Sequence, residues 1–299
     1  MPDMRDQRRT IDFTFYETYH FAHLVKNVLS DQFSYIRTIN EFYGDGSVHG
    51  YVAPFPRWTA FHSFIEFVLT DVISEEAGEV DLERRQKDIE RFKDIPSALE
   101  PHPARLPIEL AMARFQVQHE SFENWLSTAR NGRAFLDADE QDVDEYYDDL
   151  RLGGEFSQLI SRASREVFFV LFQNRDVLLL FNDMMAQAMT RDAGEHDPDV
   201  DQHFQRDGVL KRVGIPRWVQ KAVFFRDRGR CVLCDCDLSG LLSSWADENF
   251  DHMVSRAAGG LNDCTNIQLL CGPCNLKKSA GEPITSSRYE AWFDDREEE

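Results

Sequence analysis

The 299-residue sequence has no cysteine outside one stretch, because all six lie between Cys231 and Cys274. A secreted disulfide-bonded protein would rarely crowd every cysteine into one small segment, so a reducing compartment and a metal site are favoured. The sequence also lacks a long apolar run, since its most apolar stretch, 167–181, is interrupted by the polar residues 173–176. A bilayer crossing needs about 20 apolar residues, and no apolar signal core follows the first residues. We therefore expect a cytoplasmic protein without a membrane partner.

An excess of positive charge is missing as well, with 33 Lys and Arg against 53 Asp and Glu and a formal net charge of −20. The imbalance is uneven along the chain. Residues 206–282 hold 11 basic and nine acidic residues, whereas the rest holds 22 basic and 44 acidic ones, a charge of −22. The acidity therefore belongs to the rest of the chain, where it would repel DNA.

Helical patterns dominate the first 190 residues. Apolar residues recur at three- and four-residue steps, as is typical of amphipathic helices. These stretches are 21–29 and 58–73, while 106–126 also looks helical and a charged helical pattern covers 81–93. The stretch 156–189 is apolar on nearly all sides, so it is expected to form one long buried helix or two. Residues 191–205 have few large apolar side chains and are interpreted as a linker.

Eight acidic residues lie among the thirteen from Asp137 to Asp149. The simpler interpretation is a solvated helix face or loop. The alternatives are a DNA-mimicking inhibitory segment and a surface that docks a partner. Because no catalytic pattern appears in residues 1–190, we expect an acidic α-helical domain with a sensory, regulatory or partner-binding role.

Two Cys-x-x-Cys pairs frame the most informative part of the chain. The pairs are Cys231 with Cys234 and Cys271 with Cys274. Two thiolates separated by a tight turn can face one metal, so the pairs predict a tetrahedral structural zinc site. Such a closed site would hold a hairpin to a helix and would not perform chemistry. The remaining Cys236 and Cys264 are interpreted as free thiols, with Cys236 as a rival ligand.

The residues between the cysteine pairs predict two strands and a helix. Residues 249–254 indicate a first strand, Gly259 and Gly260 permit a loop, and 267–270 indicate the returning strand. Gly272 and Pro273 then begin a helix. This helix carries Asn275 and Lys278, which share a face because they are three residues apart.

The stretch from Cys231 to Lys278 resembles the HNH endonucleases, whose core is a β-hairpin and a helix around one catalytic metal. The resemblance implies that His252 is the general base and that Asn266 holds the loop and helps to orient that base. It also implies that Asp251 and Asn275 bind a divalent cation such as Mg²⁺ or Mn²⁺. The family often has a final histidine where Asn275 stands, so the sequence is an H-N-N variant.

These residue types suit phosphodiester hydrolysis. The reaction needs an activated water, a cation on the scissile phosphate and a stabilised leaving oxygen. A neutral imidazole is a suitable base near pH 7, and a hard cation held by few protein oxygens leaves room for phosphate. We expect phosphate contacts from Lys278, Arg230 and Arg256.

A basic segment precedes the first cysteine pair, with eight basic and two acidic residues in 206–230. Ile215 and Pro216 predict the start of a helix. Val219, Val223 and Phe224 would dock this helix on the zinc module. Its basic residues, Lys221, Arg226, Arg228 and Arg230, are expected to stay outside. They would either contact phosphate or form an ordinary solvated face.

The sequence thus predicts an α+β protein. A mainly helical domain (1–190) and a linker (191–205) precede an HNH nuclease module (206–285) and an acidic tail (286–299). The expected function is metal-dependent hydrolysis of DNA, which is expected to be double-stranded, in defence against foreign DNA. The alternative is a non-catalytic zinc module that binds nucleic acid or protein. The helical domain is expected to mediate homo-oligomerisation or to bind a protein partner.

Overall fold

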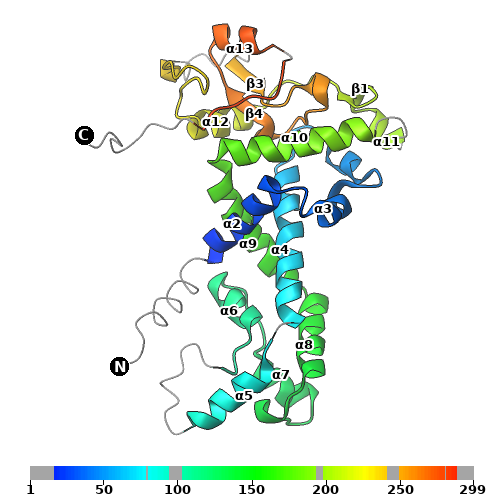
Figure 1. The fold of residues 1–299 in the computed structure, drawn as a ribbon, viewed down its shortest axis with the longest axis vertical. Coiled ribbons are helices and arrows are strands. Elements are labelled where there is room, and N and C mark those ends of the chain that lie inside the picture. Colours follow the sequence, from blue (N-terminus) through cyan, green and yellow to red (C-terminus); the bar gives the residue numbers. More distant parts are fainter. Residues whose placement is uncertain are drawn as a thin grey trace, which may run out of the picture. The chain divides into compact units, whose positions relative to one another are not determined.

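The computed structural model describes residues 17–78, 80–93, 103–192, 198–240, 249–279 and 281–287 (Figure 1). By their contacts, the residues form two compact units. The first unit takes in the chain up to Phe21 and Ile65–Val167, and the second takes in Ala22–Phe64 and Phe168–Glu299. Within the described ranges, no helix combines the length and apolarity that a bilayer crossing would require. The secondary structure is mainly helical with short strand pairs, which confirms the predicted α+β class.

The first unit is helical. Its elements are parts of α2 (Glu17–Ser30), α4 (Ala60–Gly78) and α9 (Glu155–Phe172), together with α5 (Leu82–Arg91), α6 (Pro107–Arg114), α7 (Phe122–Ala129), η3 (Phe135–Asp137) and α8 (Glu140–Gly153). The expected helix at 106–126 is two helices. Gln116 takes a positive φ of 56°, which ends α6, and the Ser121 side chain accepts the Asn124 N–H at the start of α7.

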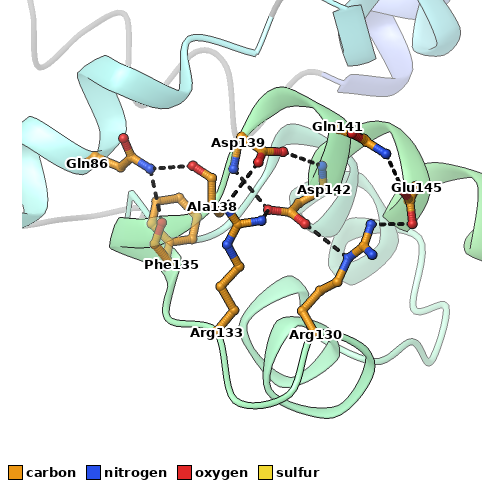
Figure 2. Close-up of polar contacts among 9 residues, drawn as sticks. All are labelled: Gln86, Arg130, Arg133, Phe135, Ala138, Asp139, Gln141, Asp142 and Glu145. Carbon is orange, nitrogen blue, oxygen red and sulfur yellow. Dashed lines mark hydrogen bonds and ion pairs between the residues drawn. The ribbon is translucent and has the colours of Figure 1, made fainter.

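The acidic run 137–149 is built into this unit as the start of α8 (Figure 2). The side chain of Asp142 is 1% exposed and lies 2.5 Å from Arg133 Nη1 and 3.1 Å from Arg130 Nε. Asp139 caps the helix by accepting the Asp142 N–H, and Glu145 pairs with Arg130. The run therefore forms a helix face, as the simpler interpretation expected, and several of its acids hold neighbouring segments. A role in docking or DNA mimicry stays a prediction.

The second unit combines helices with the C-terminal strands. It contains α3 (Ile36–Tyr43), η1 (Ser47–Tyr51), α10 (Arg175–Arg191), α11 (Pro198–Asp201), β1 (Phe204–Arg206), β2 (Val209–Leu210), α12 (Arg217–Arg226), β3 (Phe250–His252), η6 (Arg256–Ala258), η7 (Cys264–Asn266), β4 (Ile267–Leu269) and α13 (Gly272–Lys278). The strands form two antiparallel pairs, β1 with β2 and β3 with β4. The stretch 156–189 forms two helices, because Asn174 caps a new helix by accepting the Val177 N–H.

Helix α10 lies beside the C-terminal strand–loop–strand segment and contacts its turns η6 and η7 (Figure 1). Asn182 donates to the Thr265 hydroxyl at 3.2 Å, and both side chains are fully buried. By contacts, α10 therefore belongs with the strands that follow it. The predicted parts, 1–190 and 206–285 joined by a linker at 191–205, stay a prediction about separately acting domains. Residues 193–197 of that linker and 288–299 of the predicted tail lie outside the described residues.

The position predicted for one basic side chain of α12 is wrong. Val219, Val223 and Phe224 are buried as expected, but Arg226 is only 2% exposed and does not stay outside. Its guanidinium pairs with Asp227 at 2.8 Å and donates to the Ile267 carbonyl at 2.6 Å. A charged group is stable in the interior only when it is paired and hydrogen-bonded, and the adjacent carboxylate meets that condition.

Candidate metal centre and active site

The hairpin β3–β4 and the helix α13 form the predicted strand–strand–helix unit. The paired residues are Phe250 with Leu269, Asp251 with Gln268, and His252 with Ile267. Cys271 then caps α13, and Pro273 lies in the first turn of this helix. Asp251 and His252 are half-buried on β3, and Asn275 is half-buried on α13. The hairpin and the helix therefore bring the three polar side chains into one region.

Two glycines allow the loop between the strands to fold closely. Gly259 has a φ of +87°, and a Cβ atom there would lie 2.6 Å from the Ala186 carbonyl of α10. At Gly260, a Cβ atom would lie 2.0 Å from the Val254 carbonyl. No side chain fits at such distances, so both positions require glycine. The loop predicted from these glycines is confirmed, and α10 forms part of its packing.

The Asn266 side chain holds this loop through hydrogen bonds to the loop backbone. This side chain is fully buried. Its Oδ1 accepts the Val254 N–H at 2.9 Å, and its Nδ2 donates to the carbonyls of Val254 and Leu261 at 3.0 and 2.9 Å. The amide thus makes hydrogen bonds on both sides, which fixes the turn that follows His252. Asn266 does not line the cavity described below.

The four predicted cysteines come together as one candidate metal centre. The Sγ atoms of Cys231, Cys234, Cys271 and Cys274 all lie within 4.8 Å of one another. The Sγ atoms of Cys234 and Cys271 are 3.7 Å apart. Tetrahedral zinc with Zn–S bonds of about 2.3 Å requires sulfur atoms about 3.8 Å apart, so the cluster fits this ion. Spacing in the sequence does not by itself distinguish a metal site from four unrelated thiols, whereas the distances between the Sγ atoms do.

The remaining thiols lie outside this group. A backbone N–H of Cys236 lowers the pKa of Cys234 to about 6, which favours the metal-binding thiolate. Partial desolvation and then the neighbouring thiols of Cys234 and Cys271 raise the pKa of Cys236 to about 12, although its side chain is exposed. Cys264 is buried, and this burial raises its pKa to about 12. Neither residue belongs to the candidate metal centre found among the described residues.

An open cavity of about 400 Å³ brings the candidate catalytic residues together. Asp251, His252 and Asn275 all line it, as does Arg256. The exposed Arg212, which follows the β1–β2 hairpin and was not singled out from the sequence, also lines it. Burial and then the neighbouring charge of Arg212 lower the pKa of Arg256. The cavity thus joins oxygen ligands, an imidazole and two neighbouring cations.

The cavity wall holds His252 in its neutral form. Burial lowers the pKa of His252 to about 4, against smaller opposing effects of Asn262 and Asp251. The imidazole is therefore uncharged at pH 7, which is the form that can accept a proton. Asn262 contacts the ring directly, with its Oδ1 3.1 Å from Nε2. The sequence carried no signal for Asn262, because its contact depends on how the loop folds back.

Two of the predicted phosphate contacts have other partners. The Lys278 side chain is 1% exposed, and its ammonium lies 2.9 Å from Asp251 Oδ2 and 2.7 Å from the His252 carbonyl oxygen. It therefore holds the Asp251 carboxylate and strand β3. Arg230 donates to the Asp235 carbonyl at 2.9 Å and does not line the cavity. Phosphate binding by either residue stays a prediction.

Comparison with known protein families identifies the stretch that contains both centres. Residues 231–281 match the model of the family described as HNH endonuclease. Neither a comparison with curated proteins nor one with solved structures found a match. The family match begins at the first zinc-type cysteine and ends just beyond Lys278. The resemblance stated from the sequence is thus confirmed for residues 231–281, the stretch that matches the HNH endonuclease model.

Proposed function

We propose that this chain is a divalent-metal-dependent endonuclease that hydrolyses phosphodiester bonds of DNA. The observation that carries the proposal is the single cavity that Asp251, His252 and Asn275 share. One carboxylate and one amide suit a hard cation such as Mg²⁺ or Mn²⁺, because such ions prefer oxygen ligands and keep several waters. When bound, such a cation polarises the scissile phosphate and stabilises the leaving oxygen.

The chain's own residues then have separate tasks. His252 accepts the proton of the attacking water, since its neutral imidazole lines the cavity. Lys278 orients the Asp251 carboxylate toward the cation from a buried position. Arg212 and Arg256 attract the phosphate backbone, because their adjacent positive charges are relieved by an anion. The four cysteines bind zinc and hold the hairpin to the helix.

Cleavage of a supercoiled plasmid tests this function. The full chain is incubated with Mg²⁺ or Mn²⁺, and with EDTA as the metal-free arm. We expect divalent-dependent nicking that His252→Ala reduces by at least about 100-fold, the lower range for loss of general-base catalysis. His23→Ala is the matched control, because His23 is an exposed histidine on α2. Binding without nicking in any metal would instead support the alternative, a non-catalytic zinc module that binds nucleic acid or protein.

The biological setting is a narrower proposal. One catalytic site makes one nick, so cleavage of both strands requires two events or two copies of the chain. The charge of −22 outside the module would repel DNA and so supports restraint of the nuclease until a partner binds. A defence role against foreign DNA accords with such restraint. Equal phage plaque counts on cells that express wild type and His252→Ala would contradict that role.

A further inference from the structure

We propose that Asn262 is a positioning residue that selects the catalytic tautomer of His252, with the proton on Nε2 and the lone pair on Nδ1. This inference rests on the proposed function for its catalytic meaning, but the tautomer itself can be measured without catalysis. Asn262 is 4% exposed and lies in the loop between β3 and β4. Neither the predicted site nor the pattern of the HNH motif includes it.

The orientation of the Asn262 amide follows from its second partner. One end of the amide lies 3.0 Å from the carbonyl oxygen of Lys211. A backbone carbonyl can only accept, so the group facing it must be the amide nitrogen. The other end, which lies 3.1 Å from His252 Nε2, is therefore the oxygen Oδ1. The hydrogen bond to the Lys211 carbonyl thus determines which end of the Asn262 amide is oxygen and which is nitrogen.

The orientation of the amide then decides where His252 carries its proton. An amide oxygen has no hydrogen to donate, so the Nε2 that contacts it must be the N–H of the ring. Neutral imidazole carries one proton, which leaves the lone pair on Nδ1. Within the described part of the chain, no hydrogen bond engages Nδ1, and His252 lines the cavity. Nδ1 is therefore the nitrogen that accepts the proton of the attacking water.

Elements outside the family match hold Asn262 in place. Its backbone carbonyl accepts the Phe55 N–H at 2.7 Å. Lys211, which receives its side-chain hydrogen bond, donates its own N–H to the His203 carbonyl at 2.8 Å and so extends the β1–β2 hairpin. Both partners precede residue 231, where the family match begins. In this chain, the β1–β2 hairpin and the segment before α4 hold Asn262, and through it the His252 ring, in place.

A matched pair of variants isolates the hydrogen bond to His252. Asn262→Asp and Asn262→Leu keep the four side-chain heavy atoms and the branch at Cγ of asparagine, and both remove the donation to Lys211. Only the aspartate keeps an oxygen that accepts from Nε2–H. We expect Asn262→Leu to lower kcat for plasmid nicking about 10- to 100-fold with little change in KM. This is the size of effect found for residues that orient a functional side chain through a hydrogen bond. Asn262→Asp should retain most of the activity.

The direct test is the ¹⁵N spectrum of full-length protein labelled at histidine, at a pH where His252 is neutral. Wild type and Asn262→Asp should show His252 with a protonated Nε2, and Asn262→Leu should show a mixture of both tautomers. A wild-type ring protonated at Nδ1 would overturn the inference even if the protein cleaves DNA. Equal kcat and equal tautomers in the two variants would overturn it too. A protein that cleaves nothing but shows the Nε2–H tautomer would refute the proposed function alone.

Discussion

Arg175 of α10 and Asp227 at the end of α12 form a buried ion pair, with Nη1 and Oδ1 3.3 Å apart and side chains 3% and 0% exposed. The same carboxylate pairs with Arg226 and accepts the Leu269 N–H of β4 at 2.9 Å. One acid thus joins a helix far upstream in the sequence to the β3–β4 hairpin. The consequence is that the stability of the HNH module depends on a helix outside the family match.

Asp227→Asn should destabilise the second unit strongly. The substitution leaves two buried guanidinium groups without their counter-charge, which typically lowers the free energy of unfolding by about 3–5 kcal/mol. Urea unfolding followed by intrinsic tryptophan fluorescence measures this change. The matched control is Asp235→Asn, because the pair of Asp235 with Arg230 is half exposed and should contribute under about 1 kcal/mol. Similar effects of both substitutions would contradict the role of the buried pair.

The fragment 206–299 should not fold as the full chain does. It lacks Arg175 and Asn182 of α10, and it lacks the Ala60 N–H that the buried Asp263 carboxylate accepts at 3.1 Å. Removing these partners leaves polar groups unsatisfied and exposes apolar surface. We expect poor dispersion in its amide spectrum and no cooperative unfolding, even with zinc added. A well-dispersed spectrum for the fragment would show that the module is independent.

Cys234→Ser should lose the bound zinc, whereas Cys236→Ser should keep one zinc per chain. The first thiol belongs to the four-sulfur cluster and the second does not. Structural zinc contributes directly to folding, so Cys234→Ser should also unfold at a lower temperature. Metal analysis of the purified proteins measures the number of zinc ions per chain. Loss of zinc in Cys236→Ser would identify that cysteine as the true ligand.

Arg212→Ala should weaken DNA binding without changing the fold. The side chain is exposed and lines the cavity. Losing one phosphate contact should lower the slope of log affinity against log salt by about 1. Binding measured with the His252→Ala protein at several salt concentrations avoids cleavage during the assay. Lys26→Ala is the control because Lys26 is exposed on α2 and does not line the cavity, and an equal slope for both variants would refute the contact.

Acid should weaken the first unit, and Glu145→Gln should reduce that effect. The Arg130 guanidinium holds the pKa of Glu145 below its ordinary value of 4.5. Because the folded pKa is the lower one, its stabilising contribution is present above pH 4.5 and is lost as the pH falls below that value. Urea unfolding between pH 6 and pH 3 should show a shallower loss for Glu145→Gln. Asp144→Asn, at an exposed position of the same helix, is the control, and an equal change in both variants would contradict the role of the Glu145 ion pair.

Local pattern predicted much of the C-terminal architecture. The cysteine spacing, the two glycines and Pro273 predicted the four-cysteine cluster, the close loop and the start of α13, because each depends on neighbours within a few residues. The burial of Arg226 was missed, since its partners Ile267 and Phe172 are distant in sequence. The role of Lys278 beside Asp251 was missed for the same reason. The pattern of charged residues along a helix does not indicate which of them will pair with a carboxylate from another part of the fold.

The sequence by itself determined the match of residues 231–281 to the HNH model, the four cysteines that could hold a metal ion, and the candidate imidazole with its oxygen-bearing neighbours. These follow from side-chain chemistry at short spacing. Only the tertiary structure decided that Asn262 faces His252, that Arg212 joins the cavity and that α10 supports the hairpin. Those relationships join segments separated by ten to eighty-three residues. Packing of the whole chain, rather than local preference, sets such contacts.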